Sequence, residues 1–342
     1  MTFSEPWHLR SGVQFLDEVT EALYDGGAWI TPDASFPDDF VAALENRLHD
    51  DRWRVASVPA AGPDKPLNRV AEVFDVSATR LALATPGLSQ HVVVVDLRDA
   101  RPAETASWVE FATRFAPIRR EEGTGLSLCV LSQAEPPPDM RAPAWLGRIR
   151  RADAALWADM HALTDRPEPL GHLIHSISIE LLGWRLDLAQ SFMQVAMSDA
   201  LDPLLWLARR EEKPQAMASE FNGRRFECPL HLLGQQDSRQ LRNRLWRAHL
   251  TAIFPWIEDQ RQHLLMQFRD ALTLSDLHRE RFRINDVAEL EVSEIARQLR
   301  DLALLPREEQ GACFALGEIR KDLAHRKPAK PQDLARALEA FK

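Results

Sequence analysis

The feature that most constrains the fold is a run of three consecutive prolines at residues 136–138, within the segment EPPPDMRAP that begins at Glu135. Proline has no backbone N–H and a fixed φ, so such a run interrupts both helices and central strands. The hydrophobic patterns on its two sides also differ. We therefore predict a linker at residues 135–143 that joins an N-terminal domain, residues 1–134, to a C-terminal region, residues 144–342.

Short apolar runs alternate with helical periodicity in the N-terminal domain. HVVVVDL, which begins at His91, and LSLCVL, which begins at Leu126, are apolar at consecutive positions, as expected of parallel strands covered on both faces. Further strands are expected at GAWIT and WRVASV, with helices between the strands. This alternation predicts an α/β domain with a mostly parallel sheet.

The C-terminal region shows almost only the helical spacing of apolar side chains. Leu241, Leu245 and Ala248, for example, share one face of a long predicted helix. We detect no internal repeat and no low-complexity segment in this region. The pattern predicts an all-α region.

Several classes of protein are disfavoured by the composition. No stretch reaches the roughly 18 consecutive apolar residues of a membrane-spanning helix, and MTFSEPWHLRSG lacks the pattern of a secretion signal. The three cysteines form no CxxC pair. His172 and His175 have no further ligand run nearby, so we interpret them as core histidines and expect no metal site. We expect a cytoplasmic protein with free thiols and no membrane contact.

Acidic residues are concentrated at the N-terminal side of the chain. The net charge is −9, and the first 140 residues contain 22 acidic and 12 basic residues, against 29 and 30 in the remainder. The first part therefore repels phosphate backbones, and the second is nearly neutral. The chain as a whole does not have the charge of a nucleic-acid coat protein.

The sequence contains no standard phosphate-binding loop. That motif requires a glycine directly before its lysine, and none of the six lysines follows a glycine. Gly123 and Gly125 precede a predicted strand and lack the third glycine of the dinucleotide-binding motif, which should follow a strand. We therefore expect neither a Walker A site nor Rossmann-type cofactor binding.

HVVVVDL nevertheless has the form of a Walker B strand, with Asp96 at its end, although a polar residue there can also simply meet solvent. The order of elements resembles the core of STAND and AAA-like P-loop ATPases, with GGAWITPDASFPDDF in place of the phosphate loop. The resemblance implies a P-loop-NTPase-like topology in which Asp96 holds magnesium and Ser132 senses the γ-phosphate. Because the loop lysine is missing, we expect a degenerate core without a resident cofactor, any ATP or magnesium binding being vestigial.

Near the C-terminus, ALGEIRKDLAHRKP contains Arg320 and His325 at the end of a predicted helix. This spacing resembles the Arg-x4-6-His signature of HEPN domains, which are helical, commonly dimeric and, in active members, cleave RNA. The resemblance implies that Arg320 stabilises the phosphate transition state and that His325 acts as general acid or base. Lys321 departs from the Asn, Asp or His that usually follows the arginine. Cations that stabilise a helix C-terminus are the structural alternative.

The same spacing occurs six times in this arginine-rich chain, so the spacing alone does not identify a site. Arg242 and His249 form the second candidate pair, because they share a predicted helix face and Asn243 supplies the polar residue of the family. A solvated arginine face on a core helix is the alternative interpretation of this segment.

Together, the two resemblances predict a non-catalytic regulatory or scaffolding component of a bacterial conflict system, such as anti-phage defence, that acts through other proteins of that system. One alternative is a metal-independent HEPN-type ribonuclease that uses Arg320 and His325; RNA is a partner only in that case. Another is a non-hydrolysing nucleotide-binding switch that uses Asp96. A homodimer is compatible with each of them.

Overall fold

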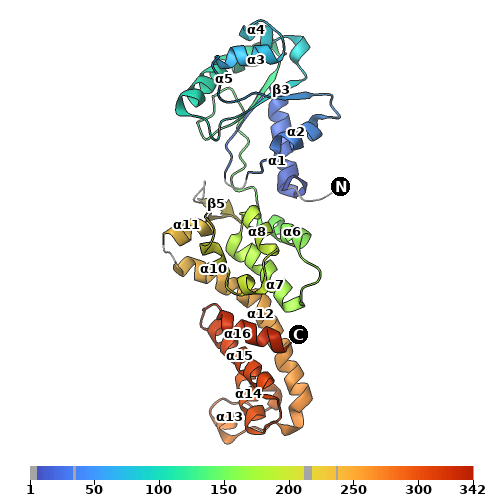
Figure 1. The fold of residues 1–342 in the computed structure, drawn as a ribbon. Helices are drawn as coiled ribbons and strands as arrows, with labels where there is room; N and C mark the ends of the chain where they lie inside the picture. The colour runs from blue at the N-terminus through green and yellow to red at the C-terminus, as the bar shows by residue number, and fades with distance from the viewer. Residues whose placement is uncertain (1–5, 34–35, 212–217, 236–237, 342) are drawn as a thin grey trace. The chain divides into compact units, whose positions relative to one another are not determined.

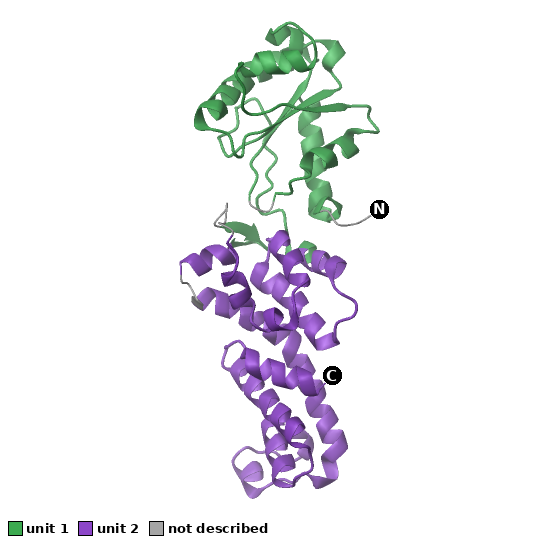
Figure 2. Cartoon of the chain, in the orientation of Figure 1, with its two compact units in different colours: residues 1–153, 218–226 green, residues 154–217, 227–342 purple. Residues whose placement is uncertain are grey.

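The computed structural model describes residues 6–33, 36–211, 218–235 and 238–341. The chain divides into two compact units, shown in Figure 2. Unit 1 comprises Met1–Asp153 and Ala218–Phe226, and unit 2 comprises Ala154–Met217 and Glu227–Lys342.

Unit 1 contains a four-stranded sheet in which every neighbouring pair of strands is parallel. The sheet order is β2–β3–β4–β1. In β3 and β4 the apolar residues are buried along the strands, as the consecutive apolar runs predict. The predicted α/β domain with a parallel sheet is therefore confirmed. The strands are β1 (Gly27–Ile30), β2 (Arg54–Ser57), β3 (His91–Asp96) and β4 (Ser127–Leu131).

Helices cover both faces of this sheet (Figure 1). Trp108, Phe111 and Phe115 of α5 are buried in one core with Val93 and Leu128 of the sheet. On the opposite face, α1 packs on β1 and β4, and α2 packs on β2. The helices of unit 1 are α1 (Arg10–Tyr24), α2 (Phe40–Leu48), α3 (Pro66–Val73), α4 (Arg80–Leu83) and α5 (Pro102–Glu122), with 3-10 turns at Pro6–His8 and Pro86–Leu88.

The segment predicted as a linker packs on unit 1. Isolated parallel bridges join Ala28 to Arg141 and Thr31 to Ala144, and Trp29 N donates a hydrogen bond to Arg141 O at 2.8 Å. These contacts follow the prolines, which cannot donate backbone hydrogen bonds but do not prevent the next residues from lying along the free edge of β1. The boundary between the units therefore falls at Asp153 rather than at residues 135–143.

The region predicted to be all-α also contains a two-stranded sheet, formed by β5 (Ala218–Phe221) and β6 (Arg224–Glu227). Asn222 and Gly223 connect the strands, and their φ angles of 54° and 72° are those of a tight hairpin turn. Ser219 Oγ accepts a hydrogen bond from Gly147 N at 3.2 Å, which ties the hairpin to unit 1. Helical periodicity does not reveal strands of only four residues.

In the part of unit 2 that the structure describes, Glu227, the last residue of β6, is the only strand residue, and every other regular element is a helix or a helical turn. The 31-residue helix α12 packs against α7 and α15, and α15 also packs against α14 and α16. No helix among the described residues is long and apolar enough to cross a membrane. The remaining helices are α6 (Arg151–His161), α7 (Glu168–Ile177), a π-helical turn (Ser178–Leu182), α8 (Leu186–Met193), α9 (Met197–Leu201), α10 (Pro203–Ala208), α11 (Pro229–Gly234), α12 (Ser238–Phe268), α13 (Asp276–Glu280), α14 (Val292–Asp301), α15 (Arg307–Ala324) and α16 (Pro331–Ala340), with 3-10 turns at Arg269–Ala271 and Val287–Glu289.

Candidate functional sites

The first candidate site lies at the carboxyl edge of the sheet, where Asp96 ends β3. Arg98 Nε lies 3.1 Å from Asp96 Oδ1 and 3.0 Å from Oδ2, and Arg98 Nη2 lies 2.7 Å from Oδ2. Arg98 Nη1 reaches Asp38 Oδ1 at 3.3 Å. The Asp96 carboxylate therefore binds a guanidinium at both of its oxygens.

This pairing determines the charge state of Asp96. Burial disfavours its charged form, but the hydrogen bonds from Arg98 outweigh that effect and lower the pKa of the carboxyl below its ordinary value. A magnesium ion at Asp96 would have to displace Arg98. Without a loop lysine, the residues at this edge do not fit a magnesium–nucleotide complex in the way that the ATPase resemblance implies.

Ser132 lies at the same sheet edge, because Asp96 is in register with Leu131. Ser132 is buried; its N–H donates to Ile30 O at 2.9 Å, and its Oγ accepts a hydrogen bond from Ala134 N at 3.1 Å. The hydroxyl therefore stabilises the turn after β4. In the segment that stands in place of the phosphate loop, residues 34–35 lie outside the described residues.

The second candidate site is not assembled within unit 2. Arg320 Nε lies 3.1 Å from Glu258 Oε1 of α12, and Arg320 Nη1 pairs with Glu291, the residue before α14. His325 is exposed at the C-terminal cap of α15. No hydrogen bond or ion pair between described residues joins the side chains of Arg320 and His325.

Arg320 instead belongs to an ion-pair network that connects α12, α15 and the start of α14. Burial raises the pKa of Glu258, but hydrogen bonds from Arg261 and Arg320 outweigh it, and the pKa falls below its usual value. The guanidinium of Arg320 also lies 5.8 Å from the centroid of the Phe254 ring. These contacts hold Arg320 as a structural cation.

In the second candidate pair, Arg242 lies at the surface of the protein and His249 lies in its core. Arg242 is exposed, whereas His249 is fully buried, and its Nδ1 accepts a hydrogen bond from Ala329 N at 3.0 Å. Burial lowers the pKa of His249 to about 3, so its imidazole is neutral near pH 7. A shared helix face does not bring these two side chains to one site.

The structure also contains a cavity that the sequence interpretation missed. Its volume is about 350 Å³, and its lining includes Asp159, Arg166, His172 and His175. His175 Nε2 lies 2.9 Å from Asp159 Oδ1, and Arg166 Nη2 donates to Val195 O at 2.7 Å. The sequence offered His172 and His175, which we interpreted as core histidines, but His172 is exposed, His175 is half-buried, and both line this cavity. Among the described residues, no group of three or more His, Cys, Asp or Glu side chains could hold a metal ion.

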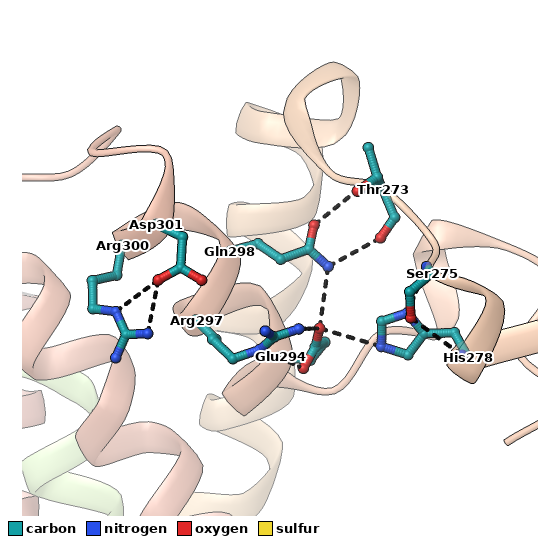
Figure 3. A network of polar contacts seen from close by, with 8 residues as sticks. All are labelled: Thr273, Ser275, His278, Glu294, Arg297, Gln298, Arg300 and Asp301. Atoms are coloured by element: carbon teal, nitrogen blue, oxygen red, sulfur yellow. Dashed lines mark hydrogen bonds and ion pairs between the residues drawn. The ribbon is translucent and has the colours of Figure 1, made fainter. Parts of the chain in front are cut away.

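A polar network around His278 connects α13 to α14 (Figure 3). Ser275 N donates to His278 Nδ1 at 3.0 Å, and His278 Nε2 lies 3.2 Å from Glu294 Oε1. Because Nδ1 accepts a backbone hydrogen bond, Nε2 carries the proton and donates to Glu294. The order serine, histidine, carboxylate resembles a hydrolytic triad, but Ser275 and His278 form a helix capping box, which accounts for the arrangement structurally.

Gln298 fixes the loop beside this network, since its side chain binds both backbone groups of Thr273, at 2.9 and 3.0 Å. Replacing Gln298 by alanine is expected to lower the free energy of unfolding by about 1–2 kcal/mol, because both hydrogen bonds are removed. Urea denaturation measures this change, and hydrogen exchange of Thr273 N–H locates it. Arg300→Ala, which removes an exposed pair with Asp301 and a surface contact of the guanidinium with the Phe314 ring at 5.3 Å, is the matched control and should change stability less. Equal destabilisation of the two variants would contradict the prediction.

Comparison with known proteins leaves these sites to be judged on their geometry. No protein-family model matches the chain, and no curated protein matches it. The ATPase and HEPN resemblances therefore depend on the residues described above.

Proposed function

We propose that this chain is a non-catalytic regulatory or scaffolding component of a bacterial conflict system and acts through protein partners. One observation carries the proposal. At each site that the two resemblances identify, the charged residue is paired with side chains of opposite charge. Asp96 is neutralised by Arg98, and Arg320 is neutralised by Glu258 and Glu291. Groups paired in this way would have to give up these charged partners before they could bind a substrate.

The topology of unit 1 supports its interpretation as a degenerate ATPase-like core. The resemblance assigns the phosphate loop to the end of β1, the sensor to the end of β4 and the Walker B carboxylate to the end of β3. These three strands are neighbours in the sheet, so their carboxyl ends lie at one edge. The positions of an ATPase site are therefore side by side, but the loop segment has no lysine and the Asp96 carboxylate is paired with Arg98.

Stability and RNA cleavage separate this proposal from the ribonuclease alternative. Arg320→Ala is expected to lower the free energy of unfolding of unit 2 by about 1–3 kcal/mol, because Glu258 and Glu291 lose their partner. His325→Ala, at an exposed position, should leave stability unchanged. The experiment measures the denaturation of both variants. In parallel, it measures how far the native chain and both variants cleave a mixed RNA pool in the presence of a chelator. Cleavage by the native chain that both substitutions abolish would establish the ribonuclease instead.

The regulatory role is tested in cells that depend on the gene for protection against phage. His325→Ala and Asp96→Asn are expected to protect as well as the native chain, because neither residue serves catalysis under the proposal. Loss of protection by a stably expressed His325→Ala protein would contradict it. Binding of ATP, detected as a rise in Tm that Asp96→Asn abolishes, would instead support the nucleotide-binding switch.

A further inference from the structure

The cavity in unit 2 is lined by residues of α6, of α7, of the loop that joins them and of α8. Its volume of about 350 Å³ is at the small end of the range for ligand pockets, so it suits a small molecule and not a helix or a nucleic-acid strand. Leu163, Ile174 and Met193 contribute apolar surface to the lining, and the last two are buried. These three residues form an apolar wall.

Arg166 contributes a permanent positive charge to the lining, and it makes no ion pair among the described residues. Its Nη2 donates to Val195 O at 2.7 Å, which uses one of the five N–H donors of the guanidinium. Its Nη1 has no hydrogen-bond partner in the described chain. Burial lowers the pKa of Arg166 below its ordinary value, but the guanidinium stays charged near pH 7. An incompletely paired guanidinium at a cavity is suited to a carboxylate or another anion.

Glu168 contributes a negative charge to the same lining. It is exposed, and its side chain forms no ion pair or hydrogen bond with any described residue. The helix dipole favours an acidic residue in the first turn of α7, which explains why Glu168 is tolerated there. The dipole does not explain why Glu168 and Arg166 line one cavity without pairing with each other. Opposite charges arranged in this way match a ligand that carries both.

The second acidic residue of the lining, Asp159, already has a partner, since its Oδ1 lies 2.9 Å from His175 Nε2. Asp159 therefore does not replace a ligand at Arg166. Asp159 and Glu168 also disfavour a phosphate dianion, because two carboxylates in the lining would repel it. A carboxylate, with a single negative charge, fits this cavity better.

The loop between α6 and α7 is attached at both of its ends to the residues that follow α8. Gln194 Nε2 donates to His161 O at 3.2 Å at the start of the loop, and Arg166 donates to Val195 O near its end. Arg166 and the apolar wall are thereby held in place before a ligand binds. A lining that is ordered in advance loses less conformational entropy on binding.

We propose that this cavity binds a free amino acid with an apolar side chain. The carboxylate of the ligand pairs with Arg166, its ammonium group pairs with Glu168, and its side chain lies against the apolar wall. A residue within a peptide carries neither of these two charges on its backbone, so the ligand is a free amino acid. The inference adds a small ligand to the proposed function and does not depend on it.

The test titrates the full chain with L-leucine, L-methionine, L-phenylalanine and inorganic phosphate, and ligand-detected NMR measures binding. We expect saturable binding of at least one of the amino acids, tighter than that of phosphate. The amino acid that binds most tightly is then compared with its amide, which lacks the carboxylate, and with its desamino analogue, which lacks the ammonium group. Each analogue should bind about tenfold more weakly or worse, because one charged partner of the cavity is left without its ligand group.

Two substitutions assign the two charges. Arg166→Gln should abolish the preference for the amino acid over its amide, and Glu168→Gln should abolish the preference over the desamino analogue. Arg69→Gln changes an arginine of unit 1 whose hydrogen bonds are also to backbone carbonyl groups. Glu308→Gln changes an exposed acidic residue in the first turn of another helix, α15. Both controls should keep both preferences, and the Tm of each variant verifies folding.

Several outcomes would overturn the proposal. An amide or a desamino analogue that binds as tightly as the amino acid would show that the cavity does not recognise the corresponding charge. Tighter binding of phosphate would indicate an inorganic or phosphorylated anion instead. No saturable binding of any of the three amino acids, or the same loss of preference in the control variants, would also contradict it.

Discussion

Trp145→Ala is expected to lower the free energy of unfolding of unit 1 by about 3–5 kcal/mol, one of the two largest effects that we predict. The Trp145 side chain is fully buried, and its ring centroid lies 5.1 Å from that of Phe15 and 5.3 Å from that of Trp7. Truncation leaves a cavity that the rings of this cluster cannot fill without leaving their packed positions. Urea denaturation, followed by tryptophan fluorescence and circular dichroism, measures the change.

The neighbouring residue provides the control. Leu146 is 54% exposed, so Leu146→Ala removes apolar surface that is already largely in water and should change stability by about 0.5 kcal/mol or less. A residue in a linker would tolerate both substitutions. A small effect of Trp145→Ala would therefore contradict the packing of this segment on unit 1.

Acidification is expected to destabilise unit 2 through His249. Burial lowers the pKa of its imidazole to about 3, whereas that of a histidine in an unfolded chain is about 6.5. Below about pH 6.5 the unfolded chain binds a proton that the folded chain does not bind. The free energy of unfolding therefore falls by up to about 1.4 kcal/mol per pH unit, until the folded imidazole also titrates at about pH 3.

Urea denaturation at several pH values between about 7 and 5 measures this slope, in a range mostly above the titration of carboxylates. His249→Asn keeps an acceptor for the N–H of Ala329 but does not titrate, so its slope should be flatter than that of the native chain. His325→Asn makes the same replacement at an exposed position and controls for the substitution itself. A slope that His249→Asn leaves unchanged would show that other groups cause the pH dependence.

The parallel sheet could be predicted because burial on both faces imposes consecutive apolar residues, which residues 92–95 show directly. The hairpin could not be found from periodicity, since its strands are too short, although Asn222 and Gly223 are a recognised turn pair. The proline run correctly indicated an interruption, but prolines do not determine whether the residues after them pack on a domain.

The candidate sites were less predictable because their chemistry depends on partners that the sequence does not specify. Asp96 was placed correctly at a strand end, yet the pattern did not show that Arg98 would turn back to bind it. The partners of Arg320 come from two other segments, and only the packing of three helices brings Glu258 and Glu291 to it. Burial of His249 likewise follows from the contact with Ala329, which is distant in sequence.

The β5–β6 hairpin gives the two units an interleaved connectivity. Because most of this hairpin belongs to unit 1 but is encoded between two portions of unit 2, the backbone passes from one unit to the other three times. No single cut in the gene separates the units intact: a fragment that ends at Asp153 lacks Ser219, the partner of Gly147 and Asp33. Recombination that exchanges one unit for a foreign domain would therefore damage the other, so the two units are expected to be inherited together.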